Sequence, residues 1–172
     1  TQLKHDAVSR LMKHFIADKD KRIGAVAGNV KVGNQRNMLT YWQAIEYTSS
    51  QNFDRMAYSN INAITVVPGA IGAFRKEVIE EVGGFTTDTL AEDCDLTMSI
   101  NEHGYIIENE NYAVAMTEAP ETLRQFVKQR IRWCFGVMQA FWKHRSSLFS
   151  PSKKGFGLWA MPNMLIFQYI IP

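Results

Sequence analysis

The chain has 172 residues, of which 46% are apolar and 12% aromatic. This length and composition predict one globular domain with a real core, and they exclude an intrinsically disordered chain. Two cysteines, Cys94 and Cys134, are too few for a disulfide framework and lack the spacing of a metal site, which favours a reduced, cytoplasm-facing environment.

The charges are segregated along the chain, although the formal net charge is only +2. Residues 77–121 contain twelve Asp or Glu and no Lys or Arg, and residues 122–154 contain eight Lys or Arg and no acid. The basic stretch therefore carries +8 and the remainder −6, while residues 155–172 carry no charged side chain. An acidic block, a basic block and an apolar tail in this order suggest a functional site beside a membrane edge.

The first predicted element is a helix near the N-terminus, where apolar residues recur at helical spacing: Val8, Leu11, Met12 and Phe15. No signal peptide precedes it, and the chain starts without Met and stops inside an apolar run, so we expect a piece of a longer protein. Residues 23–32 are β-rich and punctuated by glycine, which predicts a strand beside a site. Residues 37–58 predict a long helix that covers a sheet and buries its aromatic side chains in the core.

The later elements alternate between strand and helix. Thr89 and Glu92 have the spacing of a capping box, which predicts a helix that ends at Gly104. The other predicted elements are, in order, a strand and turn over 64–75, a short helix over 76–82 closed by Gly83-Gly84, a strand over 105–115 and a long helix from about Leu123. This alternation argues for an α/β layer fold.

The first motif with chemical potential is the acidic run Glu92-Asp93-Cys94-Asp95 in the first turn of the capped helix. Acids at a helix N-terminus complement the macrodipole and need no further purpose. The functional interpretation is that one carboxylate accepts a proton from an attacking hydroxyl. Glu92 and Asp95 share a helical face while Asp93 points roughly 100° away from Glu92, so the three acids need not share a role. Asp93 is the first candidate to test as the base.

The second motif is Gln129-Arg130-Ile131-Arg132-Trp133 in the basic block. A solvated basic helix face with one buried Trp is the ordinary explanation of such a run. However, Gln129, Arg132 and Trp133 lie on one face, where they supply an amide, a guanidinium suited to phosphate oxygens and an indole on which a sugar ring can stack. The motif therefore also suits a pyrophosphate-and-sugar site.

The third feature is the stretch 135–154, in which aromatic and aliphatic residues recur at helical spacing around Lys143, His144 and Arg145. It is either a core helix or an amphipathic helix in the membrane interface followed by a basic linker. Residues 155–172 are uncharged and just short of the ~20 residues that span a bilayer, so we expect the start of a transmembrane segment. Basic residues on its N-terminal side predict that the globular part faces the cytoplasm.

Taken together and in this order, the motifs resemble the processive, membrane-embedded glycosyltransferases of family 2, which include cellulose, hyaluronan, chitin and poly-N-acetylglucosamine synthases. The resemblance covers nearly the whole chain. It implies that Asp93, preceded by Glu92, supplies the catalytic base, and that the Gln-x-x-Arg-Trp motif contacts the donor diphosphate and the acceptor through Gln129, Arg132 and Trp133, with Arg130 beside them. A small-residue acceptor loop is matched by Pro68, Gly69, Ala70 and Gly72, and residues 43–47 look like a helix of the poly-N-acetylglucosamine branch.

The resemblance implies an α/β fold: the acceptor-side part of a GT-A-like nucleotide-diphospho-sugar transferase domain over residues 1–134. The interface helix and linker would occupy 135–154, and a truncated transmembrane segment 155–172. Family members hold a divalent cation, Mg or Mn, through an Asp-x-Asp motif that we expect outside this chain, because neither Asp18-Lys19-Asp20 nor Asp93-Cys94-Asp95 replaces it. The chain alone is therefore expected to be inactive, with no metal ligands of its own.

The implied reaction is the inverting transfer of a sugar from a UDP-sugar to a growing β-linked polysaccharide, by a multi-pass protein at the cytoplasmic face of the cell membrane. Its partners would be the UDP-sugar donor, a glycan acceptor, the lipid bilayer and an accessory membrane subunit. Two alternatives stay open: a non-processive glycosyltransferase that acts on a lipid carrier, and a membrane-binding module without catalysis. A strongly acidic half beside the basic block argues against a nucleic-acid binder.

Overall fold

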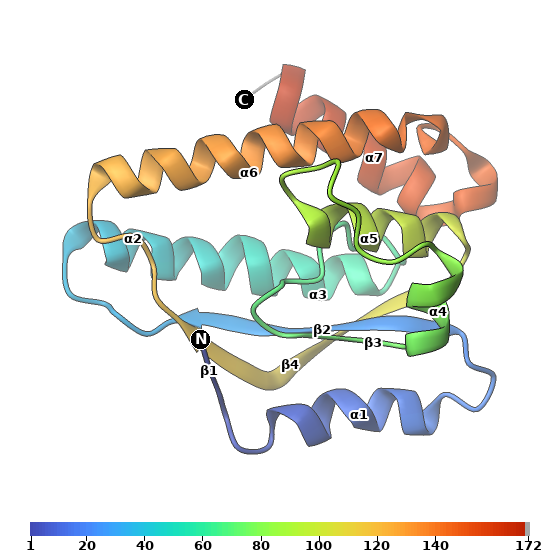
Figure 1. Cartoon of the computed structure of the whole chain (residues 1–172), viewed down its shortest axis with the longest axis horizontal. Coiled ribbons are helices and arrows are strands. Elements are labelled where there is room, and N and C mark those ends of the chain that lie inside the picture. The colour runs from blue at the N-terminus through green and yellow to red at the C-terminus, as the bar shows by residue number, and fades with distance from the viewer. Residues whose placement is uncertain (171–172) are drawn as a thin grey trace.

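The described part of the chain contains a four-stranded mixed sheet with helices on both faces (Figure 1). The computed structural model describes residues 1–170, apart from the side chains of residues 50, 51, 168 and 169. The strand order is β1-β4-β2-β3, with β1 at Gln2–Leu3, β2 at Ile23–Val32, β3 at Gly72–Phe74 and β4 at Ile106–Thr117. β2 and β4 pair in parallel, whereas β1 and β3 pair antiparallel to their neighbours. This mixed sheet confirms the predicted α/β class.

β2 is buried on both faces over most of its length. Val26 and Val30 pack on one side in a cluster with Leu11 of helix α1 (Ala7–Ala17). Ala25 and Ala27 pack on the other side with residues of α4 (Lys76–Glu81), of α5 (Glu92–Glu102) and of the loop that precedes β3. The predicted strand over 23–32 and the helices at the N-terminus and over 76–82 are confirmed, and the two glycines that follow α4 have positive φ angles of 89° and 76°.

The predicted helix over 37–58 is formed by α2 (Met38–Glu46), a π-helical turn η1 (Tyr47–Phe53) and α3 (Asp54–Ser59). Its aromatic residues were expected in the core, and this expectation is wrong for three of them, including Tyr41, which is 52% exposed. Trp42 is 70% exposed and Phe53 67% exposed, whereas Tyr47 is buried. The buried face of α2 instead carries the polar residues Thr40 and Gln43. Gln43 can be buried because its side-chain amide donates a hydrogen bond to the backbone carbonyl oxygen of Pro120, 2.9 Å away.

The predicted strand and turn over 64–75 are mostly irregular backbone, and only β3 is a strand. Residues 63–71 instead hydrogen-bond to α5: the buried Asn101 side chain donates to the carbonyl oxygen of Ile64 at 2.9 Å. Gly72 begins β3 where a Cβ atom would lie 2.5 Å from a methyl group of Val67, so the turn needs a glycine there.

The predicted capping box of α5 is wrong. The N-cap is Ala91, which makes no side-chain cap hydrogen bond, and Thr89 lies two residues outside the helix. The reason is tertiary, because the backbone of Leu90 is bonded on both sides by α6 (Leu123–Lys143): its N–H donates to Gln139 at 3.0 Å and its carbonyl accepts from Arg132 at 3.3 Å.

Helix α6 begins where the sequence predicts, with the Thr122 hydroxyl accepting from the N–H of Gln125. It runs without a break through residue 134, where the predicted division into a catalytic part and an interface helix lies. In Figure 1 it extends across the side of α2 and α3 that faces away from the sheet. The division at 134/135 therefore stays a prediction, and it falls inside one continuous helix.

The C-terminal segment packs on the α5 and α6 layer. Its short elements are η2 (Arg145–Ser147), η3 (Pro151–Lys153), η4 (Phe156–Ala160), α7 (Met161–Leu165) and η5 (Ile166–Ile170). Phe156, Met161 and Met164 are buried in a cluster with Met98 and Phe141. Among the described residues, none of the helices combines the length and apolarity that crossing a bilayer requires. The start of a transmembrane segment at 155–172 is thus not confirmed, and residues 171 and 172 lie outside the described part.

Candidate active site

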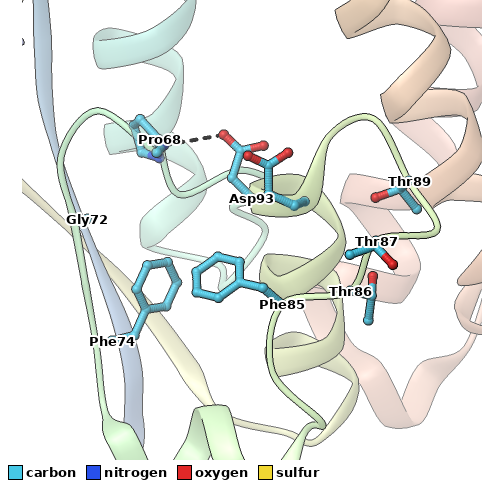
Figure 2. A pocket seen from close by; sticks show the side chains of 10 residues that line it. Pro68, Gly72, Phe74, Phe85, Thr86, Thr87, Thr89 and Asp93 are labelled. Carbon is cyan, nitrogen blue, oxygen red and sulfur yellow. Dashed lines mark hydrogen bonds between the residues drawn. The ribbon is translucent and has the colours of Figure 1, made fainter.

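The acidic run at the start of α5 is divided by the fold. Glu92 is exposed, Asp93 is partly buried and Asp95 is only 1% exposed. Asp93 accepts hydrogen bonds from two backbone N–H groups, from Gly69 at 3.3 Å to Oδ2 and from Cys94 at 2.9 Å to Oδ1. Its carboxylate therefore faces the small-residue loop that the sequence predicts as a binding element, and Figure 2 shows it beside Pro68.

A buried threonine holds this loop against α5. The Thr97 hydroxyl donates to the carbonyl oxygen of Asp93 at 2.5 Å and accepts from the N–H of Val67 at 2.9 Å. Because Thr97 is fully buried, water does not compete for these two bonds. The loop backbone at Pro68 and Gly69 is thereby fixed beside the Asp93 carboxylate.

Two cavities meet at Asp93. The large cavity, of about 640 Å³, lies between α3, the loop, the start of α5 and α6. Eight of the predicted site residues line it: Pro68, Gly69, Ala70, Glu92, Asp93, Gln129, Arg132 and Trp133. The second, which we call the Phe85 pocket, has about 560 Å³ and shares Pro68, Gly69, Glu92 and Asp93 with the first. Gly72, predicted with the loop, lines the Phe85 pocket instead.

Gly136 allows α6 to approach the start of α5. A Cβ atom at this position would lie 2.7 Å from both the backbone nitrogen and the Cβ of Ala91, and 2.8 Å from the carbonyl carbon of Leu90. Backbone atoms cannot give way to such a contact. This close approach brings the face with Gln129, Arg132 and Trp133 over the Asp93 side of α5. The sequence reasoning missed Gly136; its signal was a lone glycine inside an otherwise helical pattern.

The Gln-x-x-Arg-Trp face points to the large cavity. The Oε1 atom of Gln129 is buried and has no hydrogen-bond partner in the described structure, so a ligand donor would satisfy it. The exposed Arg132 makes one hydrogen bond, to Leu90. The indole of Trp133 packs near the ring of Tyr47, with a centroid separation of 6.5 Å. Amide, guanidinium and indole thus border one space, as predicted.

Arg130 is separated from this group. Its guanidinium forms a two-pronged ion pair with Glu46 of α2, at 2.5 and 2.7 Å, and lies 4.8 Å from the ring centroids of Phe126 and Trp133. It lines neither cavity. The arrangement fastens α6 to α2 and leaves Arg132 as the arginine of the motif that borders the large cavity.

Arg55 is a cavity residue that the sequence reasoning missed. It is only 7% exposed, lines the large cavity from α3 and donates to the carbonyl oxygen of Gly28 at 3.1 Å. Burial lowers the pKa of Arg55 to about 10, while the negative charge of Asp93 acts in the opposite direction. The signal in the sequence was that Arg55 is the only basic residue between Arg36 and Arg75.

Asp95 belongs to an internal ionic network. Its carboxylate accepts from Thr86 at 2.6 Å and lies 2.9 Å from both Lys143 and His144, and the other ring nitrogen of His144 lies 2.7 Å from Glu102. Burial alone would raise the pKa of Asp95, but its three partners hold that pKa below its ordinary value. Burial alone would lower the pKa of His144, and the two carboxylates raise it.

This network revises the expected basic patch for the membrane. His144 is buried against α5, and Lys143, although exposed, is paired through its ammonium group with Asp88 and Asp95, so both residues are engaged in joining the end of α6 to the α5 side of the fold. Arg145 is exposed. The network also separates Asp95 from Asp93, because each carboxylate has different partners. Within the described part of the chain, no three His, Cys, Asp or Glu side chains are arranged to hold a metal ion. The described residues therefore do not fit a divalent cation by themselves.

Residues 1–171 match the family described as glycosyl transferase family group 2. A poly-beta-1,6-N-acetyl-D-glucosamine synthase of Staphylococcus aureus (strain COL) is 30% identical over 172 residues, which cover 99% of this chain and 40% of that protein. The protein of the same name from Staphylococcus epidermidis is 30% identical over 146 residues, covering 83% of this chain and 35% of that one. The chain thus spans about two fifths of the S. aureus relative's length.

Among solved structures, the mannosyltransferase PcManGT from Pyrobaculum calidifontis, in complex with GDP-Man and Mn²⁺, matches with a TM-score of 0.67 and 23% identity. The match covers 94% of this chain and 41% of that one, and it supports the predicted GT-A-like fold. Because the family match extends over nearly all residues, from the N-terminal strand to the C-terminal helical segment, the chain belongs to glycosyl transferase family group 2.

Proposed function

We propose that this chain is the acceptor-side part of an inverting glycosyltransferase that moves a sugar from a UDP-sugar to a growing β-linked polysaccharide. The observation that carries the proposal is the position of Asp93 at the meeting point of two cavities, one of which is also lined by Gln129, Arg132 and Trp133. A general base, a phosphate-binding guanidinium and a sugar-stacking indole then border one space.

In the proposed reaction, Asp93 is the base. The acceptor hydroxyl loses its proton to the Asp93 carboxylate while its oxygen forms a bond to the anomeric carbon of the donor sugar. The bond from that carbon to the diphosphate oxygen breaks on the opposite face, and its electron pair leaves with the diphosphate, which inverts the anomeric centre. The backbone N–H groups of Gly69 and Cys94 orient the carboxylate. Glu92, exposed at the rim of both cavities, adds negative charge beside the base.

The other cavity residues have separate roles in the proposal. Arg132 and Gln129 offset the charge that develops on the leaving diphosphate, and Trp133 orients the acceptor. Arg55 adds a second, buried guanidinium to the same cavity. The loop at Pro68, Gly69 and Ala70 contributes backbone that a sugar can approach closely.

We propose N-acetylglucosamine as the transferred sugar, because the relatives with 30% identity are named as poly-beta-1,6-N-acetyl-D-glucosamine synthases. The divalent cation expected for such a transfer would be held by residues outside this chain. Under this proposal the chain needs the remainder of a catalytic domain for activity.

The membrane part of the proposal rests on α6. An exposed apolar stripe follows its length at intervals of three or four residues: Leu123, Val127, Ile131, Phe135, Met138 and Trp142. The helix has 21 residues, roughly 30 Å, and exposed Arg124 and Lys128 add basic charge to its surface. The exposed Arg145 follows its C-terminal end, in η2. We propose that this stripe rests on the cytoplasmic surface of the cell membrane, where an accessory membrane subunit could contact it.

The test of catalysis is Asp93→Asn in the full-length protein. Transfer from UDP-N-acetylglucosamine should fall by roughly 10²- to 10⁴-fold while UDP still binds, because only the proton acceptor is removed. Glu80→Gln, which neutralises an exposed acid that lines neither cavity, is the matched control and should keep full turnover. Substantial turnover by Asp93→Asn would refute its assignment as the base.

The remaining alternatives are distinguished by product and by lipid binding. A non-processive enzyme acting on a lipid carrier adds one sugar, so a product ladder that lengthens with time contradicts it. A membrane-binding module binds vesicles but forms no donor-dependent product. Vesicle flotation combined with a radiolabelled-donor assay separates these outcomes.

A further inference from the structure

The proposed chemistry uses the large cavity and leaves the Phe85 pocket without a role. Outside the four shared residues, its wall is formed by Gly72 and Phe74 of β3 and by the loop between α4 and α5, which contributes Phe85, Thr86, Thr87 and Thr89. Figure 2 shows the rings of Phe74 and Phe85 on one side of Asp93 and the three threonines on the other. Its volume of about 560 Å³ falls within the range of about 300 to 1,000 Å³ that is typical of small-molecule sites.

One side of the pocket is aromatic. The rings of Phe74 and Phe85 meet edge to face, with centroids 6.0 Å apart and planes at 78°. Phe85 is 55% exposed, so part of its ring is open to a ligand. The C–H face of a pyranose is apolar and flat, and it packs against an aromatic face in the same way as another apolar group does. This wall therefore suits a sugar ring.

The other side is polar but carries no cation. Of the ten described residues that line the pocket, none is Lys, Arg or His, whereas Glu92 and Asp93 are carboxylates. This lining disfavours a diphosphate, because it supplies two carboxylates and no basic side chain. A neutral hydroxyl donates to a carboxylate without this cost.

A buried hydroxyl in the wall has no partner. Thr89 is 9% exposed, and within the described structure nothing hydrogen-bonds to its Oγ1 atom. Buried polar atoms are nearly always satisfied, so an unsatisfied one beside a cavity indicates a missing ligand group. The neighbouring Thr86 hydroxyl, by contrast, donates to Asp95. Thr89 is therefore the threonine here with an unmet hydrogen bond.

We propose that the Phe85 pocket binds a neutral sugar ring, packed on Phe85 and hydrogen-bonded by Thr89, with one hydroxyl directed to the carboxylates of Asp93 and Glu92. The inference rests on the proposed function, since it supplies that function with a sugar subsite separate from the cationic cavity. Two molecules carry this chemistry: the transferred sugar of the donor and a sugar residue of the acceptor glycan.

The experiment compares full-length wild type with Phe85→Ala, Phe85→Trp and the control Phe53→Ala. Phe53 is similarly exposed, at 67%, but lines neither cavity. Removing the ring at residue 85 should raise the KM for one of the two substrates, donor or acceptor, by about fivefold. If the donor sugar is the occupant, the KM for UDP-N-acetylglucosamine rises while the affinity for UDP is unchanged. If the acceptor is the occupant, only the KM for a β-1,6-linked N-acetylglucosamine oligosaccharide rises. Phe85→Trp keeps an aromatic face and should retain most of the affinity.

Direct binding separates this inference from the proposed function. Saturation-transfer NMR with N-acetylglucosamine and with the oligosaccharide should give a signal on wild type and on Phe53→Ala that Phe85→Ala loses, whether or not the protein turns over. The inference is overturned if neither KM nor the NMR signal changes, or if Phe53→Ala changes them equally. Turnover that persists in Asp93→Asn would refute the proposed base and leave this binding result intact.

Discussion

Asp93 and Asp95 are two residues apart on α5, yet the fold gives them different environments. Asp93 is partly buried, borders both cavities and is held by backbone N–H groups. Asp95 is 1% exposed and forms ion pairs with Lys143 and His144. The comparison teaches that neighbouring acids on one helix can have different roles: one borders the candidate active site, and the other stabilises the fold through buried ion pairs. The elements that pack against each face of the helix decide which acid has which role.

The largest expected effect is on stability at Asp95. Asp95→Ala should lower the free energy of unfolding by about 3 kcal/mol or more, because it leaves His144 and the end of Lys143 without their buried partner. Asp93→Asn, measured by the same urea unfolding, should change it by less than about 1 kcal/mol. Equal destabilisation by the two variants would contradict the division between them.

The next effect concerns the contact that joins the two sides of the site. Gly136→Val should cost about 2 kcal/mol and most of the turnover, because its side chain would press on the backbone of Leu90 and Ala91 and move α6 from α5. Gly33→Ala is the control, since the nearest atoms to a Cβ there lie 3.6 Å away. Thermal unfolding measures the loss of stability, and steady-state kinetics with the donor measure the loss of turnover. Full activity in Gly136→Val would show that the close approach is not needed.

A smaller effect is the pH dependence that His144 contributes. Its pKa is raised in the folded protein, so its stabilisation is complete below the unfolded pKa of about 6.5 and is lost as the pH rises through the folded pKa. The free energy of unfolding should therefore fall as the pH rises above about 6.5, and His144→Gln should flatten that slope. His14, whose pKa is raised by Glu108 and Glu110 despite its burial, contributes with the same sign.

His14→Gln is therefore the matched control for this titration, because it removes a similar contribution from α1 while leaving α5 and α6 unchanged. Each single variant should flatten part of the slope, and the double variant should flatten more of it than either. If His144→Gln leaves the slope as in wild type, His144 does not carry the charge that the network implies.

The smallest effect separates the two arginines of α6. Arg130→Met should cost at most about 1 kcal/mol, because its ion pair with Glu46 is partly exposed, and it should leave the KM for the donor unchanged. Arg132→Met should leave stability nearly unchanged and raise the donor KM. Steady-state kinetics on both variants make the comparison. A raised donor KM in Arg130→Met would show that Arg130 contributes to donor binding.

Local signals predicted much of the fold and several site residues. The strand over 23–32 follows from its β-branched and small residues, and the start of α6 follows from the cap at Thr122. Asp93 and the face with Gln129, Arg132 and Trp133 could be proposed because helical spacing fixes which side chains share a side. These predictions depend only on residues that are close together in the sequence.

The sequence by itself determined the alternation of strands and helices, the acids at the start of α5 and the motif face on α6, because each depends on local spacing. Only the tertiary structure decided that Trp42 and Phe53 are exposed, that Ala91 caps α5 and that Arg130 pairs with Glu46. It also decided that Arg55 enters the large cavity while Asp95 is enclosed. The physical reason is that exposure, ion pairing and cavity lining depend on contacts between residues far apart in sequence, which periodicity does not encode.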